Sequence, residues 1–196
     1  ARPDWLSLAW IGLAAGVTYI PVNLAILVPA LLARRWRPCW GARHLRPFYL
    51  PSGGTTPLAC LGHVSAALEL KQQIDAGLLL EPDYLYVALG SLGTAAGLAL
   101  GCKLAGLRTK LVGVVVSYRW YCTLRRWARI ARRTLALMRR VDPTVPNSTI
   151  EAAELEVVTS ALGPGYACVT DESRRLAQEM RTGDGLDLDG TYTAKL

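Results

Sequence analysis

The residues best suited to bind a ligand form a glycine-rich turn at positions 90–97, which reads Gly-Ser-Leu-Gly-Thr-Ala-Ala-Gly. An apolar run at 84–89 precedes the turn and small residues follow it, which predicts a strand, a turn and a helix. The first turn of such a helix leaves backbone N–H groups unpaired at the positive end of its dipole. Ser91 and Thr94 add hydroxyl donors, so the pattern predicts a phosphate cradle.

The spacing of the glycines narrows the class of phosphate. A dinucleotide site needs Gly-x-Gly-x-x-Gly with an acidic residue about 20 positions later, and a nucleoside triphosphate site ends in Gly-Lys-Ser/Thr. Here the glycines stand at 90, 93 and 97, Leu98 follows the last one, and the next strand ends at Ser117. A smaller phosphate ester remains, beside the alternative of a turn that serves packing alone. We expect Gly97 and Gly101 to let the helix lie close on the sheet.

Strands and helices must alternate to position this turn, and the chain predicts such an order. We expect strands at 48–50, 84–89, 111–116 and 155–158, and helices at 57–77, 95–105, 121–140 and 172–181. Thr56 is the expected N-cap of the first of these helices, with Pro57 at its first position. The strands are continuously apolar rather than alternating, which favours an α/β fold with a mostly parallel sheet covered by helices on both faces.

The amino-acid composition argues against a disordered chain, a disulfide framework and a metal site. The chain has 196 residues, of which 52% are hydrophobic and 19% charged, which excludes a disordered tail. The five cysteines form no Cys-x-x-Cys pair and there are two histidines, so neither a disulfide framework nor a metal site is expected. A reducing cytoplasm is the simplest setting.

The net charge of +7 comes mostly from arginine, and the densest group lies between positions 119 and 140. Arginine interleaved with Trp120 and Trp127 allows a nucleic-acid surface. We favour a helix with one packed face and one solvated basic face, because apolar residues are mixed in at helical spacing. No nucleic-acid partner is therefore expected.

The segment from Trp5 to Ala33 has no charged residue and is followed by three arginines, which makes it a candidate membrane span. Glycines and prolines divide it, and the residues from 17 to 20 have the composition of a strand. We favour a buried helix, strand and helix over a membrane contact. No cleavable signal peptide is evident.

Three motifs, in this order, resemble the pyridoxal-phosphate enzymes of the tryptophan-synthase-β fold type, and among them the D-cysteine desulfhydrase and 1-aminocyclopropane-1-carboxylate deaminase family. They are residues 49–63 (Tyr-Leu-Pro-Ser-Gly-Gly-Thr-Thr-Pro-Leu-Ala-Cys-Leu-Gly-His), the turn at 90–98, and the tail at 185–195. The resemblance covers the chain from about Tyr49 onward. It implies that 1–44 is the remnant of a smaller domain and that 45–196 is the larger, cofactor-binding domain.

The resemblance also implies roles for single residues. The cofactor phosphate is expected on Gly90, Ser91, Leu92, Gly93 and Thr94. Thr193 is expected at the pyridine nitrogen, and Tyr192 is expected on the substrate side as a proton-handling or orienting residue. Gly53, Gly54 and Thr55 are expected to line the pocket of a small amino-acid substrate. Because the ring-opening members resemble one another in having glutamate where Thr193 stands, we favour elimination of a β-substituent. The resemblance also implies a homodimer.

The sequence departs from the family pattern at several positions, and these departures leave two functional interpretations open. The family attaches its cofactor through a lysine in a Gly-Asn-Lys-x-Arg-Lys run, which these residues lack. The turn has Leu92 for a usual glycine, and His63 stands for a usual tyrosine, which we expect to be an ordinary helix residue rather than a base. One interpretation is an enzyme fragment without its N-terminal part, inactive alone. The alternative is a non-catalytic protein or fragment that retains the fold. Residues 5–33 are the segment through which it would associate with a membrane.

Overall fold

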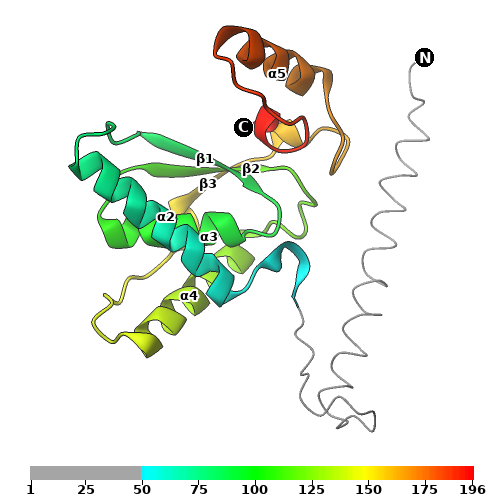
Figure 1. The fold of residues 1–196 in the computed structure, drawn as a ribbon. Coiled ribbons are helices and arrows are strands. Elements are labelled where there is room, and N and C mark those ends of the chain that lie inside the picture. Colours follow the sequence, from blue (N-terminus) through cyan, green and yellow to red (C-terminus); the bar gives the residue numbers. More distant parts are fainter. Residues whose placement is uncertain (1–49) are drawn as a thin grey trace, which may run out of the picture. The chain divides into compact units, whose positions relative to one another are not determined.

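Three parallel strands form the sheet in this computed structural model, which describes residues 50–196 (Figure 1). They are β1 (Tyr84–Leu89), β2 (Lys110–Val115) and β3 (Leu155–Val158), in the order β1-β2-β3. Leu89 pairs with Val115, so β1 and β2 end side by side. The loops that follow them therefore meet at one edge of the sheet, where ligands of parallel sheets bind.

Four helices accompany these strands in the described part of the chain: α2 (Pro57–Asp75), α3 (Gly93–Ala105), α4 (Leu124–Val141) and α5 (Asp171–Gly183). Short 3-10 turns, η1 (Ser52–Gly54), η2 (Ala152–Glu154), η3 (Ser160–Leu162) and η4 (Thr193–Lys195), complete the described elements. Successive right-handed crossovers in one direction place α3 and α4 on the same face of the sheet. α2 packs on both of them (Figure 1).

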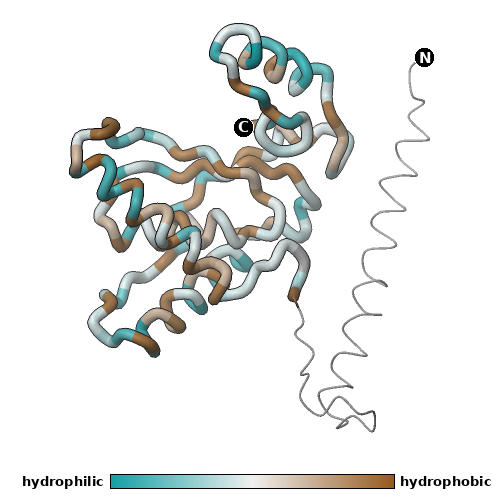
Figure 2. The backbone as a smooth tube through the Cα atoms, in the orientation of Figure 1, coloured by the Kyte–Doolittle hydropathy of each residue, from teal (hydrophilic) through white to brown (hydrophobic). Residues whose placement is uncertain are grey.

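The core lies between the sheet and this helix layer. Side chains at odd positions of the strands face the helices, among them Val87, Leu89 and Val115, and they pack with Leu100 of α3 and Trp127 of α4. Figure 2 shows the carboxyl halves of β1 and β2 as apolar, whereas α5 is mostly hydrophilic. On the other face of β1, Tyr84 and Tyr86 remain half exposed. The α/β class and the parallel sheet are confirmed.

Gly97 and Gly101 bring α3 close to α2 rather than to the sheet, so the predicted contact was wrong. A Cβ on Gly97 would lie 2.5 Å from the carbonyl oxygen of Cys60, and one on Gly101 would lie 2.7 Å from that of Val64. Which face of a helix meets which neighbour depends on the packing of the whole layer, and glycine spacing alone does not reveal it.

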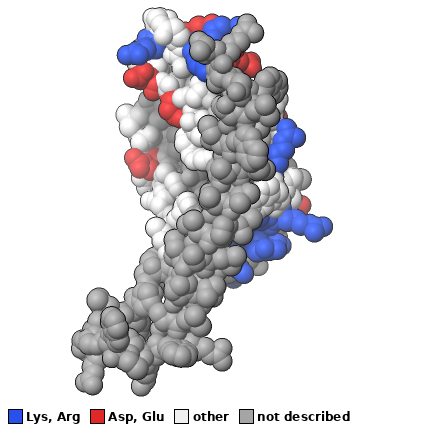
Figure 3. Space-filling model, turned by 90° about the vertical axis from the view of Figure 1, so that its right-hand side faces the viewer, with Lys and Arg blue, Asp and Glu red and all other residues white. Residues whose placement is uncertain are grey.

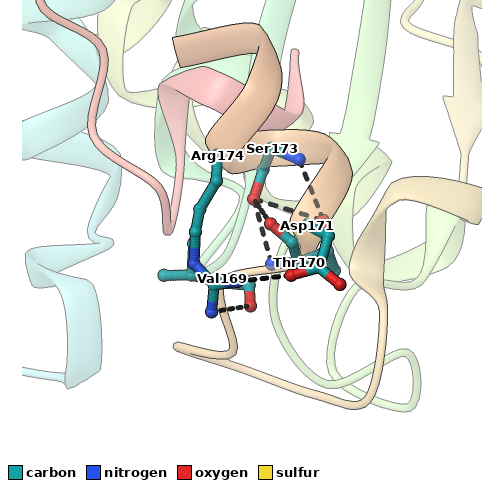
Figure 4. A network of polar contacts seen from close by, with 5 residues as sticks. All are labelled: Val169, Thr170, Asp171, Ser173 and Arg174. Carbon is teal, nitrogen blue, oxygen red and sulfur yellow. Dashed lines mark hydrogen bonds and ion pairs between the residues drawn. The ribbon is translucent and has the colours of Figure 1, made fainter. Parts of the chain in front are cut away.

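The helix starts follow from threonine caps. Thr56, Thr123 and Thr170 have extended backbones, and their hydroxyls accept from the N–H groups of Ala59, Arg126 and Ser173. α4 begins at Leu124, three residues after the predicted start, because Thr123 caps it. Figure 4 shows the α5 cap, where the Ser173 hydroxyl in turn accepts from the N–H of Thr170 and Arg174 pairs with Asp171.

Residues Ser52 to Leu196 form one compact unit. Within the described residues, no helix combines the length and the hydropathy that crossing a bilayer requires. Three predictions concern residues outside the described part or at its border. They are the smaller-domain remnant at 1–44, the helix-strand-helix or membrane segment at 5–33, and the strand at 48–50. The boundary near residue 45 stays a prediction.

Candidate functional site

The amino end of α3 presents unpaired backbone donors. Leu92 occupies the N-cap position in a left-handed conformation, with φ 74°, and no side chain caps the helix. The N–H groups of Gly93, Thr94 and Ala95 have no acceptor within a helix that begins at Gly93, and the first helical bond runs from the N–H of Ala96 to the carbonyl of Leu92. These donors lie at the positive end of the helix dipole, which favours an anion.

A second loop, residues 53–55, closes on this turn. Gly53 has φ 69°, and a Cβ there would lie 2.4 Å from Ser91 Oγ, so only glycine fits. A Cβ on Gly93 would lie 2.9 Å from Oγ1 of Thr55. The structure therefore brings together two segments whose residues were predicted separately, one for the cofactor and one for the substrate pocket.

Thr55 supplies the clearest sign that this place receives a ligand. Its Oγ1 is buried and has no hydrogen-bond partner. Leaving a buried hydroxyl unpaired destabilises a fold by about 1–3 kcal/mol, so such a group is expected to find an acceptor when the protein is loaded. Phosphate oxygens are acceptors, and the adjacent α3 amides and the Ser91 and Thr94 hydroxyls are donors. The residues present thus fit the phosphate of pyridoxal phosphate.

Two side chains from other elements hold the turn. The thiol of Cys122 lies 3.3 Å from the carbonyl oxygen of Leu89 and 3.2 Å from that of Gly90, and donates its hydrogen to them. Burial raises the pKa of this thiol to about 11, so it keeps its hydrogen at neutral pH. His63 of α2 places Nε2 3.2 Å from Oγ1 of Thr94.

Asp189 organises the tail that precedes the C-terminus. Its carboxylate accepts from the N–H groups of Thr191, Tyr192 and Thr193 at 2.8–3.0 Å, and from the Thr193 hydroxyl at 2.7 Å. Bonds from the Thr193 backbone and hydroxyl, with those from its two neighbours, hold the pKa of Asp189 at about 2. The Nζ of Lys195 donates to the carbonyl of Leu162 at 3.0 Å, which ties η4 to η3.

Contacts through Tyr166, Tyr118 and Cys122 link the tail to the glycine turn. The rings of Tyr192 and Tyr166 lie 6.2 Å apart and those of Tyr166 and Tyr118 lie 6.3 Å apart. The carbonyl of Tyr118 accepts from the N–H of Cys122, whose thiol binds Gly90. The Thr193 hydroxyl itself is engaged with Asp189. The roles predicted for Tyr192, Thr193 and Gly54 stay predictions.

Sequence reasoning missed three of the residues that shape the site. Asp189 stands two to four residues before the N–H groups it binds, a spacing typical of a local Asx turn that inspection could have found. Cys122 and His63 act across 32 and 31 residues, and no local pattern signals either contact.

Comparison with known proteins agrees with this geometry. A family model described as "Pyridoxal-phosphate dependent enzyme" matches residues 39–196. A crystal structure described as that of "the ACC deaminase homologue" superposes with a TM-score of 0.65 at 24% sequence identity. The superposition covers 89% of this chain and 47% of that one, so the chain spans about half of that protein and shares its fold. With four fifths of its length matched by the family model, the chain belongs to the pyridoxal-phosphate-dependent enzymes.

Proposed function

We propose that this chain forms the phosphate-binding part of a pyridoxal-phosphate-dependent lyase or deaminase that acts on a small amino acid by α,β-elimination, in the manner of a D-cysteine desulfhydrase. The observation that carries the proposal is the uncapped amino end of α3 beside the unpaired Thr55 hydroxyl. The resemblance of the tail and the fold of the ACC deaminase homologue support the choice of subfamily.

In this proposal the chain's own residues bind and orient the phosphate. The amides of Gly93 and Thr94 and the hydroxyls of Thr55, Ser91 and Thr94 donate to its oxygens. Bound pyridoxal phosphate supplies an electron sink for the negative charge that develops at the α-carbon of an amino acid. The Leu92 side chain is buried in the hydrophobic core.

We assign an orienting role on the substrate side to Tyr192. Its hydroxyl lies 2.5 Å from that of Tyr166, and this hydrogen bond, with burial, raises the pKa of Tyr192 to about 12. The raised pKa makes this phenol a weaker acid than an ordinary tyrosine, so we propose that it orients the substrate by hydrogen bonding with its proton retained. Thr193 is proposed as the partner of the pyridine nitrogen, a role that requires its hydroxyl to release Asp189.

The positions of the lysines support the further proposal that these residues do not turn over substrate alone. Covalent catalysis with this cofactor begins at a lysine amine. The chain has four lysines, and each is engaged away from the turn: Lys71 with Asp75, Lys103 with Glu154, Lys110 over the ring of Tyr84, and Lys195 with Leu162. The same observation favours the second candidate function, a protein that binds the phosphate ester without chemistry.

We place this function in a reducing compartment, the cytoplasm being the simplest. The support is that Cys60, Cys102, Cys122 and Cys168 are free in the described residues.

Binding of pyridoxal phosphate to the purified 196-residue chain tests the proposal. We expect saturable, dialysable binding, followed by quenching of tryptophan fluorescence, and no hydrogen sulfide from D-cysteine. The Ser91→Ala/Thr94→Val variant should weaken binding by about tenfold or more, because two hydrogen bonds to a dianion are lost. Ser160→Ala, an exposed serine elsewhere, is the matched control.

A second arm separates the two candidate functions. A longer protein or an added segment that supplies the lysine run should restore hydrogen sulfide release if the chain is part of an elimination enzyme. Binding without release in that arm favours the non-catalytic function, and absence of any saturable binding overturns both.

A further inference from the structure

A basic hollow of about 440 Å³ lies beside the first three turns of α4. Four arginines and two threonines supply its polar lining, and Ile130 is its apolar lining residue. The polar residues are Thr55, Thr123, Arg125, Arg126, Arg129 and Arg133. We call it the arginine hollow. Its volume is within the range of small-molecule sites.

Within residues 50–196, no carboxylate forms an ion pair with the arginines of this hollow. α4 reads Leu-Arg-Arg-Trp-Ala-Arg-Ile-Ala-Arg-Arg-Thr-Leu-Ala-Leu-Met-Arg-Arg-Val, with no acidic residue. The ion pairs of the described residues involve none of its arginines. Residues 1–49 contain a single acidic residue, Asp4, and six arginines, so they add more positive charge than negative. In Figure 3 blue side chains project at the lower right, at the level of α4 in Figure 1, with the red ones mostly higher.

The spacing concentrates this charge on one helix face. Arg125, Arg129 and Arg133 follow one another at four-residue intervals, where like charges repel across successive turns. At a rise of about 1.5 Å per residue, the row is about 12 Å long, which exceeds the reach of one phosphate group. An anion with several charges relieves the repulsion along the whole row.

One guanidinium is already fixed in direction. The guanidinium carbon of Arg126 lies 3.4 Å from the ring centroid of Tyr121, and Nη2 donates to the Tyr121 hydroxyl at 2.6 Å. A planar fork held this way loses little side-chain freedom when it binds, and guanidinium groups match phosphate in two-point hydrogen bonds. Thr55 borders the same hollow.

We propose that the arginine hollow binds a small molecule bearing at least two phosphate groups, at a site separate from the glycine turn. The length of the arginine row sets the number of phosphates, and a hollow of about 440 Å³ has room for a small molecule. The lining residues that the structure describes include no aromatic side chain on which bases would stack. The site does not depend on the proposed function, although Thr55 borders both places.

Calorimetric titration of the 196-residue chain with inorganic pyrophosphate tests the proposal, with orthophosphate as the single-phosphate comparison. We expect saturable binding of pyrophosphate that is at least about tenfold tighter than that of orthophosphate. The Arg129→Gln/Arg133→Gln variant should lose at least about tenfold in affinity, because two charged donors are removed.

The matched control removes the same charge from the same helix. Arg132 and Arg140 lie outside the lining, so Arg132→Gln/Arg140→Gln should bind within about twofold of the parent chain. The cradle variant Ser91→Ala/Thr94→Val should also keep its pyrophosphate affinity, which separates this site from the one for pyridoxal phosphate. Circular dichroism establishes that each variant is folded. If either double variant is unfolded, the single variants Arg133→Gln and Arg132→Gln are compared in place of the two double variants.

Three results would overturn the proposal. The first is no saturable pyrophosphate binding, and the second is equal loss in both arginine pairs, which is the behaviour of diffuse charge. The third is binding of single-stranded oligonucleotides that strengthens with their length while pyrophosphate fails to compete, which would make the surface a nucleic-acid interface.

Discussion

The thiol of Cys122 donates to the carbonyl oxygen of Gly90 at 3.2 Å, and so joins the segment before α4 to the turn before α3. The bond occupies a carbonyl of the turn and leaves the N–H groups on the α3 side to a ligand. The thiol must stay protonated to donate this hydrogen bond, so the stability of the fold should depend on pH.

We predict a loss of stability in alkali that depends on Cys122. Its pKa rises from 9.0 to about 11 because of burial. The unfolded chain therefore releases this proton first, so the contribution is complete below about pH 9 and is lost as the pH rises to about 11. The free energy of unfolding should fall by on the order of 2 kcal/mol over this range. Urea titrations at several pH values measure it.

The Cys122→Ala variant is the control for this alkaline loss. Other buried thiols, Cys60 and Cys102, also have raised pKa values and remain in the variant. Its stability should thus fall less steeply above pH 9 than that of the parent chain. Equal slopes would show that the thiol of Cys122 is not shielded from water.

Leu92 should tolerate glycine better than alanine. Its side chain is 3% exposed, so either change removes buried apolar area, at about 2–5 kcal/mol. Alanine retains the strain of φ 74°, whereas glycine adopts this conformation freely. We expect Leu92→Gly to be more stable than Leu92→Ala by about 1 kcal/mol in urea unfolding. An alanine variant as stable as the glycine variant would contradict the left-handed assignment.

Because α3 packs closely on α2, replacing glycine by alanine should have opposite effects on stability at Gly97 and at Gly62. Gly97→Ala should destabilise the protein by about 1–3 kcal/mol, because its Cβ would lie 2.5 Å from the Cys60 carbonyl oxygen. Gly62→Ala is the matched control in α2, where a Cβ meets nothing within 4 Å. It should raise stability by about 0.5–1 kcal/mol through helix propensity. Melting temperatures that move in the same direction for both variants would exclude the close helix contact.

Asp189 should control the order of the tail in acid. Its pKa is about 2 rather than 3.8, so its contribution is present above pH 3.8 and is lost as the pH falls through about 2. Nuclear magnetic resonance should show the amides of Thr191, Tyr192 and Thr193 shifting together over this range. Asp189→Asn should abolish the transition. Asp187→Asn, which alters a neighbouring carboxylate paired with Arg181, should leave it in place.

The sequence by itself determined the elements and their order. The span of β1 and that of β3 matched the predicted ones, and Thr56 and Pro57 placed the start of α2, because apolar runs and caps act between residues close in the chain. The glycine turn was found in the same way. The anion-binding role that we propose for it rests on the end of one helix, which needs no distant partner.

The tertiary structure alone decided which groups meet at the turn. It placed Thr55 against Gly93, brought the Cys122 thiol to Gly90, and turned Gly97 toward α2 instead of the sheet. It also gathered the α4 arginines around one hollow, where sequence periodicity indicated only a solvated basic face. These contacts join residues far apart in the chain, and packing of the whole helix layer selects them, so no local pattern of residue types encodes them.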